Sequence, residues 1–376
     1  MNLDAIRAEI DGVDKELAKL FEKRMGLCTQ VAEYKKANNL PVFQPEREKQ
    51  ILEKVRKNAS EGFADAQALF FDDVMNISKC IQTEKLTELD ENDFGTPCES
   101  PEIACPGIKG SYTESACKKA FPNLRKINYV HNFEDVFEAV DKGDADYGIV
   151  PLENSTAGDV TLTYDLMGRY DFYIVKRVYI EVSHVLASKN ASTKDEIESV
   201  ISHEQALHQC AGYLRELNKP SSPVVNTSVA AKAVSESNEK LACICSADCA
   251  ELYGLKILER GIADNGENFT RFIVISKKRE LPEKADVISI MLTLPHTAGS
   301  LFRLLTRFAY VGLNLTKIES KPLPLSHNEL REERFDVVFY FDFEGNIRNE
   351  RIQKLLKSLE AEMKLYKFLG NYEEML

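Results

Sequence analysis

Positive charge is scarce in this chain of 376 residues, because 60 acidic side chains outnumber 48 basic ones and the formal net charge is -12. This balance argues against nucleic acid as a partner. No run of about eighteen apolar residues is present, as a membrane-spanning helix would require. The amino terminus has the pattern of an acidic amphipathic helix rather than of a signal peptide. We therefore expect no membrane association and a cytoplasmic location.

Sequence motifs that bind nucleotide phosphates or metal ions are also missing. There is no Walker loop, and the loop at residues 107–114 is not G-x-G-x-x-G, so neither a nucleoside triphosphate nor a nicotinamide is implied. The nine cysteines, without a secretion signal, indicate reduced thiols. Cys243, Cys245 and Cys249 could bind a metal, but their small-residue run favours a buried strand that turns into a helix. His203 and His208 have no acidic or cysteine partners nearby in the sequence, and we expect no metal and no cofactor.

The composition, 44% hydrophobic and 29% charged, is that of a globular protein, and the length suggests two or three domains. Near the start, apolar side chains keep a 3-4 spacing at Leu3, Ile6, Ile10, Val13, Leu17, Leu20, Leu27, Val31 and Tyr34. This seam predicts one helix to about Asn38, roughly 50 Å long, which needs another chain to cover it. Arg24 interrupts the seam, and a guanidinium there requires a carboxylate partner or an anionic ligand.

Two other cations relate to Arg24 in different ways. Lys35 lies eleven residues further on and returns to within roughly 20° of Arg24 on a helix, so both can reach one pocket. Arg7 precedes Arg24 by seventeen residues, roughly 25 Å of helix, which is more than a small ligand spans. If Arg7 serves a pocket, it must be the pocket of a partner chain.

Two further helices are expected in this part of the chain. Pro41 should end the first helix, and Pro45 should begin a second one that carries Arg47 and Glu48. A third should run from about Ala64 to Leu86. Its buried stripe would be Phe70, Val74, Ile77 and Ile81, with Ser78 and Gln82 facing the cations.

The first ninety residues resemble the all-helical chorismate mutase domain, in which an intertwined dimer shares its first helix between two pockets. The resemblance implies ligand-binding roles for Arg7, Arg24, Lys35, Gln44, Arg47, Glu48, Ser78 and Gln82, with Gln44 standing where some members have Asp. Chorismate rearranges to prephenate without a nucleophile or a metal, so the protein only holds a compact conformer and stabilises charge. The arginines would clamp the carboxylates, while Lys35 and Gln82 would donate to the breaking ether oxygen and Glu48 would accept the ring hydroxyl.

The acidic segment from Thr87 to Pro101 has the composition of a linker. From Ile103 to about Ser276, short apolar runs alternate with helical stretches, which predicts an α/β domain with sheets covered on both faces. Four polar loops, at residues 107–114, 151–158, 202–210 and 267–272, follow expected strands. Ligands collect at the carboxyl ends of such strands, so these loops predict one cleft. Taken singly, each loop could equally be a cap, a turn or a strand edge.

As a set the loops are similar to prephenate dehydratase, through Thr270-Arg271-Phe272, through Glu153-Asn154-Ser155 and through Ser202 to Gln205, which reads SHEQ where SHPQ is commoner. The resemblance implies two lobes like a type II periplasmic binding protein, with the site between them. Prephenate loses its ring carboxylate and its ring hydroxyl to become phenylpyruvate. Thr270 would donate to that hydroxyl, supported by Glu153, Asn154 and Gln205 or Gln209, and Arg271 would hold the pyruvyl carboxylate. Phe272 would give the departing carboxylate an apolar wall.

The last ninety residues follow a β-α-β-β-α-β order, which predicts a ferredoxin-like fold. They resemble the ACT domain that regulates amino-acid enzymes, in the form that binds phenylalanine. The resemblance implies effector contacts from Gly299, Ser300, Leu301, Asn314, Leu315, Glu319 and Ser320, with Lys321 where Arg is usual. A passive dimerisation domain is the alternative, in which Gly299 is only a helix-start turn.

We therefore expect a mutase domain at residues 1–90, a linker at 91–101, a dehydratase domain at 102–278 and an ACT domain at 285–376, in a homodimer or larger homo-oligomer. The favoured function is a bifunctional enzyme that converts chorismate through prephenate to phenylpyruvate and is inhibited by L-phenylalanine. A dehydratase whose helical domain only dimerises, and a non-enzymatic amino-acid sensor, are the alternatives.

Overall fold

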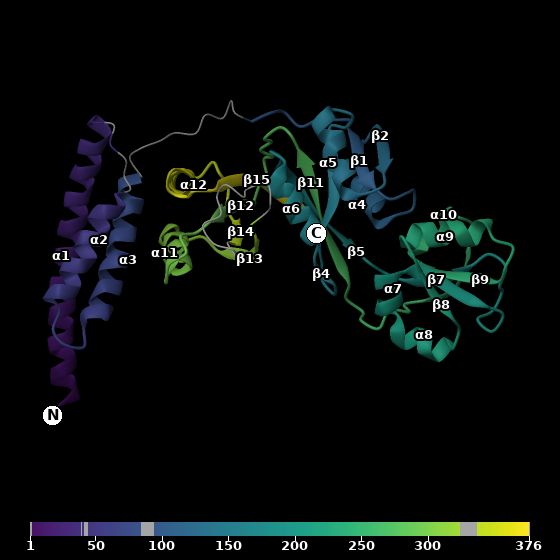
Figure 1. Cartoon of the computed structure of the whole chain (residues 1–376), viewed down its shortest axis with the longest axis horizontal. Helices are drawn as coiled ribbons and strands as arrows, with labels where there is room; N and C mark the ends of the chain where they lie inside the picture. Colours follow the sequence, from purple (N-terminus) through teal and green to yellow (C-terminus); the bar gives the residue numbers. More distant parts are fainter. Residues whose placement is uncertain (1, 39, 41–43, 84–93, 324–336, 376) are drawn as a thin grey trace. The chain divides into compact units, whose positions relative to one another are not determined.

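A computed structural model of the chain describes residues 2–38, 40, 44–83, 94–323 and 337–375 (Figure 1). Its contacts divide the chain into two units. One unit holds residues up to Glu91 together with Val287–Phe368, and the other holds Asn92–Asp286 together with Leu369–Leu376. The expected domain boundaries stay a prediction, and residues 84–93, which include the start of the expected linker, lie outside the described residues, as does Pro41.

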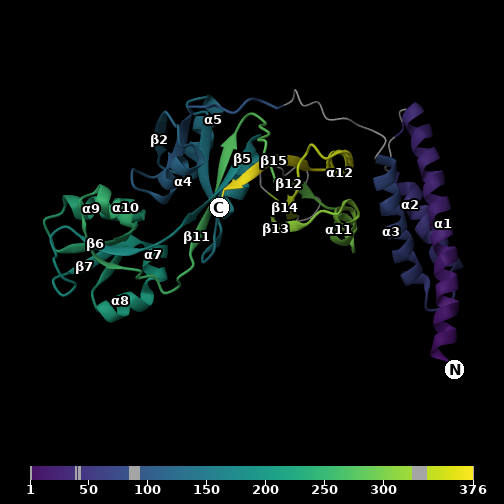
Figure 2. The ribbon, with the colours of Figure 1, turned by 180° about the vertical axis from the view of Figure 1, so that it is seen from behind.

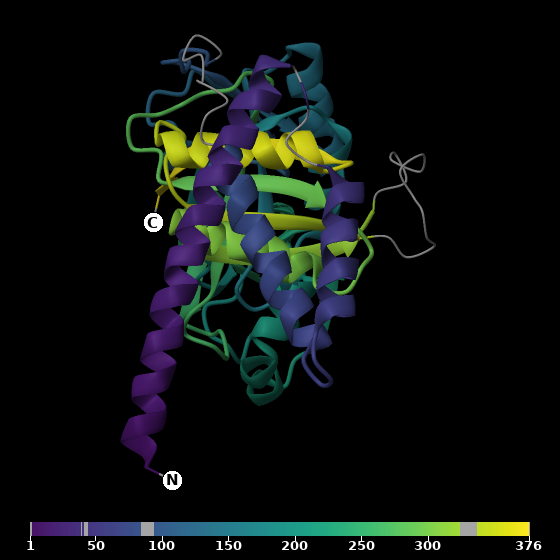
Figure 3. The ribbon, with the colours of Figure 1, turned by 90° about the vertical axis from the view of Figure 1, so that its left-hand side faces the viewer.

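The first unit begins with three helices, α1 (Leu3–Ala37), α2 (Pro45–Asn58) and α3 (Ala64–Thr83), so the predicted long helix and the predicted start at Pro45 are confirmed. The N-terminal end of α1 extends beyond α2 and α3 (Figures 1 and 3). All nine seam side chains are 37–64% exposed in the single chain. Phe70 was expected in the buried stripe of α3, but it is 45% exposed, whereas Val74 is buried. Phe70 is therefore a further apolar side chain that this chain alone does not cover.

The rest of the first unit is a ferredoxin-like fold. Its elements in order are β12 (Val287–Thr293), α11 (Ser300–Val311), β13 (Leu315–Pro322), β14 (Val337–Glu344), α12 (Glu350–Glu362) and β15 (Tyr366–Met375). The strand order is β13-β14-β12-β15, and β14 pairs antiparallel with both β12 and β13. Phe308 packs on Phe341 and Phe343 in its core. The β-α-β-β-α-β prediction is confirmed.

The second unit has two lobes. The strands of the first lobe are β1 (Glu102–Pro106), β2 (Lys126–Val130), β3 (Tyr147–Asn154), β4 (Gly158–Asp159), β5 (Tyr173–Glu181) and β11 (Phe269–Ser276). Its helices are α4 (Tyr112–Ala120), α5 (Phe133–Lys142) and α6 (Thr161–Arg169). The sheet runs β5-β11-β3-β1-β2, and the last residues of β15 pair with β5 at its edge. Ile103, Ile149 and Val274 lie in its core without solvent exposure.

The second lobe holds a five-stranded sheet in the order β10-β6-β9-β7-β8. Its strands are β6 (Val185–Ser188), β7 (Ser199–His203), β8 (Ser221–Val224), β9 (Leu241–Cys245) and β10 (Lys256–Arg260). Its helices are α7 (Glu204–Gln209), α8 (Ala211–Leu217), α9 (Thr227–Glu236) and α10 (Ala247–Leu252). Cys243, Cys245 and Cys249 are buried where β9 turns into α10, as the small-residue run predicted.

Residues 182–184 and 261–268 connect the lobes, leaving β5 and entering β11 (Figure 2). The two connections are joined by a hydrogen bond of 2.7 Å from the Val182 N–H to the Asn268 carbonyl. The predicted two-lobed α/β architecture is confirmed. None of the described helices has the length and apolar character needed to cross a membrane.

Candidate active sites

The Arg24 side chain points from α1 to α3. Its guanidinium donates to the Ser78 hydroxyl at 2.6 Å and to the Val74 carbonyl at 3.4 Å. Neither acceptor is a carboxylate, and a guanidinium has more donors than these two contacts use. The positive charge of Arg24 therefore remains available to an anionic ligand.

Lys35, Gln82 and Glu48 complete the polar group between the three helices. Lys35 is only 8% exposed, and burial lowers the pKa of its ammonium, although nearby Glu48 acts in the opposite direction. Gln82 is buried, and no described residue gives its side-chain oxygen a hydrogen bond. Glu48 is held by Lys79 at 3.2 Å, a buried cation that the sequence analysis did not select. A small anionic ligand here would meet several donors in a site that is largely shielded from water.

Three of the expected ligand-binding residues do not join this group in one chain. Arg7 is exposed on the extending part of α1 and pairs only loosely with Asp4, at 3.7 Å. Gln44 precedes α2 without a capping hydrogen bond, and Arg47 is exposed. The single chain thus forms one part of the expected site, and the separation of Arg7 from the other cations agrees with the helix geometry.

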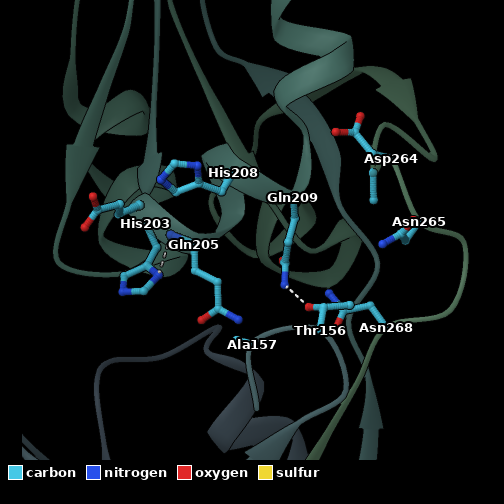
Figure 4. Close-up of a pocket in the computed structure, with 11 residues that line it drawn as sticks. Thr156, Ala157, His203, Gln205, His208, Gln209, Asp264, Asn265 and Asn268 are labelled. Atoms are coloured by element: carbon cyan, nitrogen blue, oxygen red, sulfur yellow. Dashed lines mark hydrogen bonds between the residues drawn. The ribbon is translucent and has the colours of Figure 1, made fainter.

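In the second unit, the four polar loops meet around two adjoining cavities of about 300 and about 550 Å³. The smaller cavity is lined by Gly107, Thr113, Asn154, Thr270 and Phe272, among others, and the larger one by Thr156, Asn268 and Asp264, among others (Figure 4). His203, Gln205 and Gln209 line both cavities. The prediction that these loops form one cleft is confirmed.

Asn154 sets the direction of the hydrogen bond made by Thr270. The Asn154 side-chain N–H₂ donates to the Thr270 hydroxyl at 2.9 Å, and also to the Asn268 side-chain oxygen at 2.8 Å. Because an amide nitrogen can only donate, the Thr270 oxygen accepts, and its own proton is left to donate elsewhere. Asn154 is itself fixed through its oxygen, which accepts from the Thr156 and Ala157 N–H groups at 3.1 and 3.0 Å. The Thr270 hydroxyl is therefore a preorganised donor at the cavity.

Both candidate glutamines bind across the cleft. Gln205 donates to the Asn154 oxygen at 3.2 Å. Gln209 donates to the Thr156 hydroxyl at 2.6 Å (Figure 4). The Gln209 oxygen lies 2.9 Å from His184 Nε2. His184 is almost fully buried, and this burial lowers the pKa of its imidazole. A neutral His184 imidazole with its proton on Nε2 donates a hydrogen bond to the Gln209 side-chain oxygen, and it thereby orients the Gln209 side-chain amide.

Arg271 and Glu153 lie elsewhere than expected. They form an ion pair of 2.8 Å with each other, and neither lines either cavity. Successive side chains of a strand point to opposite faces, so Thr270 and Phe272 reach the cavity while Arg271 faces away from it. Arg271 also donates to the Tyr179 hydroxyl at 2.8 Å, and that hydroxyl donates to Glu374 of β15 at 2.8 Å. This geometry does not support the expected contact of Arg271 with the pyruvyl carboxylate.

Two other expected residues make internal contacts. The Ser155 hydroxyl accepts from the Phe269 N–H at 3.0 Å, and the fully buried Ser202 hydroxyl donates to the Ile244 carbonyl at 2.7 Å. Neither side chain lines a cavity. Both hold the loops that carry the cavity residues.

The expected effector residues lie at two places in the ferredoxin-like fold. Gly299 precedes α11 with a positive φ of 81°, which favours glycine, and Ser300 and Leu301 open the helix. Asn314 lies just before β13, and Leu315, Glu319 and Ser320 lie on it; Glu319 pairs with Lys321 at 3.0 Å. β13 is at the edge of its sheet, and no hydrogen bond among the described residues joins the two places.

Comparison with known proteins decides the family. The family model for chorismate mutase type II matches residues 6–83, and that for prephenate dehydratase matches residues 103–280. A bifunctional chorismate mutase/prephenate dehydratase of Aquifex aeolicus is 34% identical over 379 residues, covering 100% of this chain and 98% of that relative. The chain belongs to the bifunctional chorismate mutase/prephenate dehydratase family.

Two further relatives match smaller parts of this chain. An arogenate dehydratase/prephenate dehydratase of Arabidopsis thaliana is 32% identical over 334 residues, 86% of each chain. The crystal structure of prephenate dehydratase from Arthrobacter aurescens in complex with L-Phe is 28% identical, with a TM-score of 0.64, and covers 72% of this chain and 89% of that one. The recognition of both enzyme parts from sequence motifs is thereby confirmed.

Sequence motifs missed Asn268, His184 and Lys79. Asn268 and His184 lie in the two connections between the lobes; Asn268 belongs to the polar loop 267–272, but no motif selected it or His184 as a site residue. Lys79 follows Ser78 directly, and its pairing with Glu48 depends on the packing of α3 against α2, which no local pattern shows. The signal for His184 is weaker, because its role depends on a contact with Gln209, 25 residues away.

Proposed function

We propose that this bifunctional enzyme rearranges chorismate to prephenate and then converts prephenate to phenylpyruvate, in the cytoplasm, as part of phenylalanine biosynthesis. One observation carries the proposal: the same chain holds two unlike sites, a cationic group between helices and a neutral cavity with a preorganised hydroxyl donor. The first suits a dianion that only needs to be held. The second suits the departure of a hydroxyl group.

In the mutase site, Arg24 binds a carboxylate of chorismate and Ser78 orients Arg24. Lys35 and Gln82 donate to the ether oxygen, on which negative charge develops as its bond to carbon breaks. Glu48, which Lys79 positions, accepts a hydrogen bond from the ring hydroxyl of chorismate. No atom of the protein forms a covalent bond, and the rate gain comes from conformer selection and charge stabilisation.

We infer that the mutase site is completed by a second copy of the chain. The exposed seam of α1 and the exposed Phe70 need an apolar cover, which an antiparallel or intertwined partner helix provides. Arg7, on the part of α1 that extends beyond α2 and α3, then reaches the pocket of the partner. Gln44 and Arg47 close the pocket from α2.

In the dehydratase site, the ring carboxylate of prephenate leaves as CO2, and its bonding electrons enter the ring as the ring hydroxyl departs. The departing oxygen takes a proton from a solvent water molecule and leaves as water, that solvent molecule becomes hydroxide, and the ring becomes aromatic. Thr270 donates a hydrogen bond to the departing oxygen, because Asn154 holds the hydroxyl in the donating direction. Phe272 removes water from the carboxylate that becomes neutral CO2.

The cavity around Thr270 favours prephenate over arogenate, the other substrate named for the Arabidopsis relative. Arogenate carries an ammonium where prephenate carries a ketone. Among the described residues that line this cavity there is no Asp or Glu; Glu204 and Asp264 line only the adjoining one, so an ammonium held beside Thr270 has no carboxylate in its own cavity. Prephenate brings no such charge.

Feedback inhibition is assigned to the ferredoxin-like part, which we propose is an ACT domain that binds L-phenylalanine. The residues opening α11 and those on β13 supply the contacts, with main-chain groups of Asn314 and Leu315 at the amino group. A preference of only about 1–3 kcal/mol for one arrangement of paired domains is enough to change activity measurably. The structure of the Arthrobacter aurescens relative with L-Phe supports this effector.

The test incubates pure protein with chorismate, with and without L-phenylalanine, and follows prephenate and phenylpyruvate. We expect both products, and less phenylpyruvate with L-phenylalanine. Arg24→Leu should abolish prephenate formation and leave prephenate consumption intact, while Thr270→Val should do the reverse. Lys15→Leu on α1 and Thr193→Val on the second lobe, both exposed, are the matched controls.

Each alternative predicts a different result. Consumption of prephenate without any change of chorismate would mean a dehydratase with a purely dimerising helical domain. If neither substrate turned over, the chain would be an amino-acid sensor. Loss of both activities in each variant would contradict two independent sites.

A further inference from the structure

The Ser228 hydroxyl is a buried polar group that the dehydratase mechanism above does not use. Ser228 lies in the first turn of α9 with no solvent exposure, and its hydroxyl has no hydrogen-bond partner among the residues that the structure describes. It lines the same cavity as Thr270. Burying a hydroxyl without a partner destabilises the folded chain, so such a group at a cavity indicates a ligand atom that satisfies it.

Two helix N-termini meet beside Ser228. α4 begins after its cap Ser111, and α9 begins after its cap Asn226. Both caps flank Gly107: a Cβ built on this glycine would lie 3.7 Å from the Ser111 hydroxyl oxygen and 3.9 Å from the Asn226 side-chain nitrogen. The φ of Gly107 is +101°, so a residue without a side chain is also required by the backbone. The two helices therefore direct their first turns toward one place.

This place offers donors and positive potential. The first N–H groups of a helix have no partner within it, and the helix dipole makes that end positive. The two caps use their side-chain oxygens on Glu114 N–H and Val229 N–H, which leaves the Asn226 side-chain nitrogen as an additional donor. Glu114, the carboxylate in the first turn of α4, pairs with Lys118 at 2.7 Å and does not line the cavity.

The charges that face the cavity also favour an anion. The titratable side chains among its described lining residues are Tyr112, His131, His184 and His203, and none of them is a carboxylate. A carboxylate is the ligand group that suits a hydroxyl donor and two helix N-termini. Which carboxylate binds follows from the chemistry: clamping the departing ring carboxylate would slow its loss, so the side-chain carboxylate is the one to hold.

We propose that Ser228 and the N-terminal turns of α4 and α9 form the subsite for the pyruvyl carboxylate of prephenate. This inference rests on the proposed dehydratase function and names the part of the site that orients the substrate. It takes over the contact expected of Arg271, which pairs with Glu153 instead. The substrate is then held at its side chain while its ring faces the Thr270 hydroxyl and Phe272.

The test is Ser228→Ala, with Ser235→Ala as the matched control. Ser235 lies later on α9, and its hydroxyl donates to the Lys232 carbonyl at 2.7 Å outside the cavity. We expect the KM of Ser228→Ala for prephenate to rise about 10- to 100-fold, the change for one lost hydrogen bond to a charged group, while kcat stays near that of the wild type. The mutase activity should be unchanged.

A stability measurement separates binding from structure. Because the Ser228 hydroxyl has no partner in the described part of the chain, its removal should leave the melting temperature unchanged or raise it. Phenylpyruvate, which keeps the carboxylate, should stabilise the wild type and Ser235→Ala far more than Ser228→Ala. Benzyl methyl ketone, which lacks the carboxylate, should not distinguish the three proteins.

Three results would overturn the subsite. The first is an unchanged KM in Ser228→Ala, and the second is an equal stabilisation of all three proteins by phenylpyruvate. A lower melting temperature together with an equal loss of kcat and kcat/KM would show a structural hydroxyl and would also contradict the proposal. Failure of the wild type to consume prephenate refutes the dehydratase function itself, and the phenylpyruvate measurement then decides the carboxylate site alone.

Discussion

The substitution Asn154→Asp should reverse the direction of the hydrogen bond between residue 154 and the Thr270 hydroxyl. In the wild type the Asn154 N–H₂ donates to the Thr270 oxygen at 2.9 Å, and the hydroxyl proton is free for the substrate. A carboxylate at this position accepts instead, so the Thr270 proton turns toward it and away from the cavity. Loss of one preorganised donor costs about 2.7–4 kcal/mol in the transition state, which predicts a kcat about 10²–10³-fold lower with a similar KM.

The same substitution also affects stability. The Asn154 nitrogen donates to the Asn268 side-chain oxygen and to the Phe269 carbonyl, at 2.8 and 3.2 Å, and both acceptors would face a carboxylate. At about 1–3 kcal/mol for an unsatisfied buried group, a fall in melting temperature of several degrees is expected. Kinetic assays are therefore run below this transition, as judged by calorimetry.

Steady-state kinetics of phenylpyruvate formation, measured against pH, check the reasoning. A protonated carboxyl group can donate again, so the kcat of the variant relative to the wild type should rise as the pH falls. Asn128→Asp is the control, since Asn128 donates only to the Asp144 carbonyl at 3.0 Å in the same lobe and away from the cavity. A kcat of Asn154→Asp within a few-fold of the wild type, or a ratio that does not change with pH, would refute the assigned donor direction.

Two further variants test stability. Glu374→Ala removes the carboxylate that lies 3.1 Å from Arg177, whose side chain is 2% exposed. Because the Glu374 side chain is itself 27% exposed, we expect the free energy of unfolding in urea to fall by about 2–3 kcal/mol. An unchanged urea midpoint would show that the ion pair contributes nothing to stability. Burial lowers the pKa of His184 below its ordinary value of 6.5, so the stability it contributes is complete above about pH 6.5 and is lost as the pH falls toward the folded-state pKa. Melting curves of His184→Asn should depend less on pH across this range than those of the wild type, and parallel curves would contradict a neutral buried imidazole.

The sequence predicted most of the architecture because its signals are local. Helix boundaries follow from Pro45 and from the glycines that flank α11, and the ferredoxin-like order follows from the spacing of apolar runs. Thr270 and Asn154 were found through motifs. Strand alternation could also have separated Arg271 from its neighbours, since adjacent residues of a strand cannot both face one cavity.

Other features depend on contacts between distant residues. Serine in the first turn of a helix is common, so Ser228 carries no signal until its burial and its missing partner are known. Phe70 fits the apolar spacing of α3 but lies on a face that the single chain leaves open. The pairing of β15 with β5 joins segments nearly 200 residues apart, and its register follows from tertiary packing rather than from a local pattern.

The pairing of the end of β15 with β5 determines how the protein can be truncated. Residues 103–280, the stretch that matches the prephenate dehydratase family, lack the edge strand that the end of β15, residues 369–375, adds beside β5. An excised fragment would leave Arg177 without Tyr372 and Glu374 and would present a bare strand edge to other molecules. A minimal dehydratase therefore also needs residues 369–375, and an affinity tag is better placed at the amino terminus.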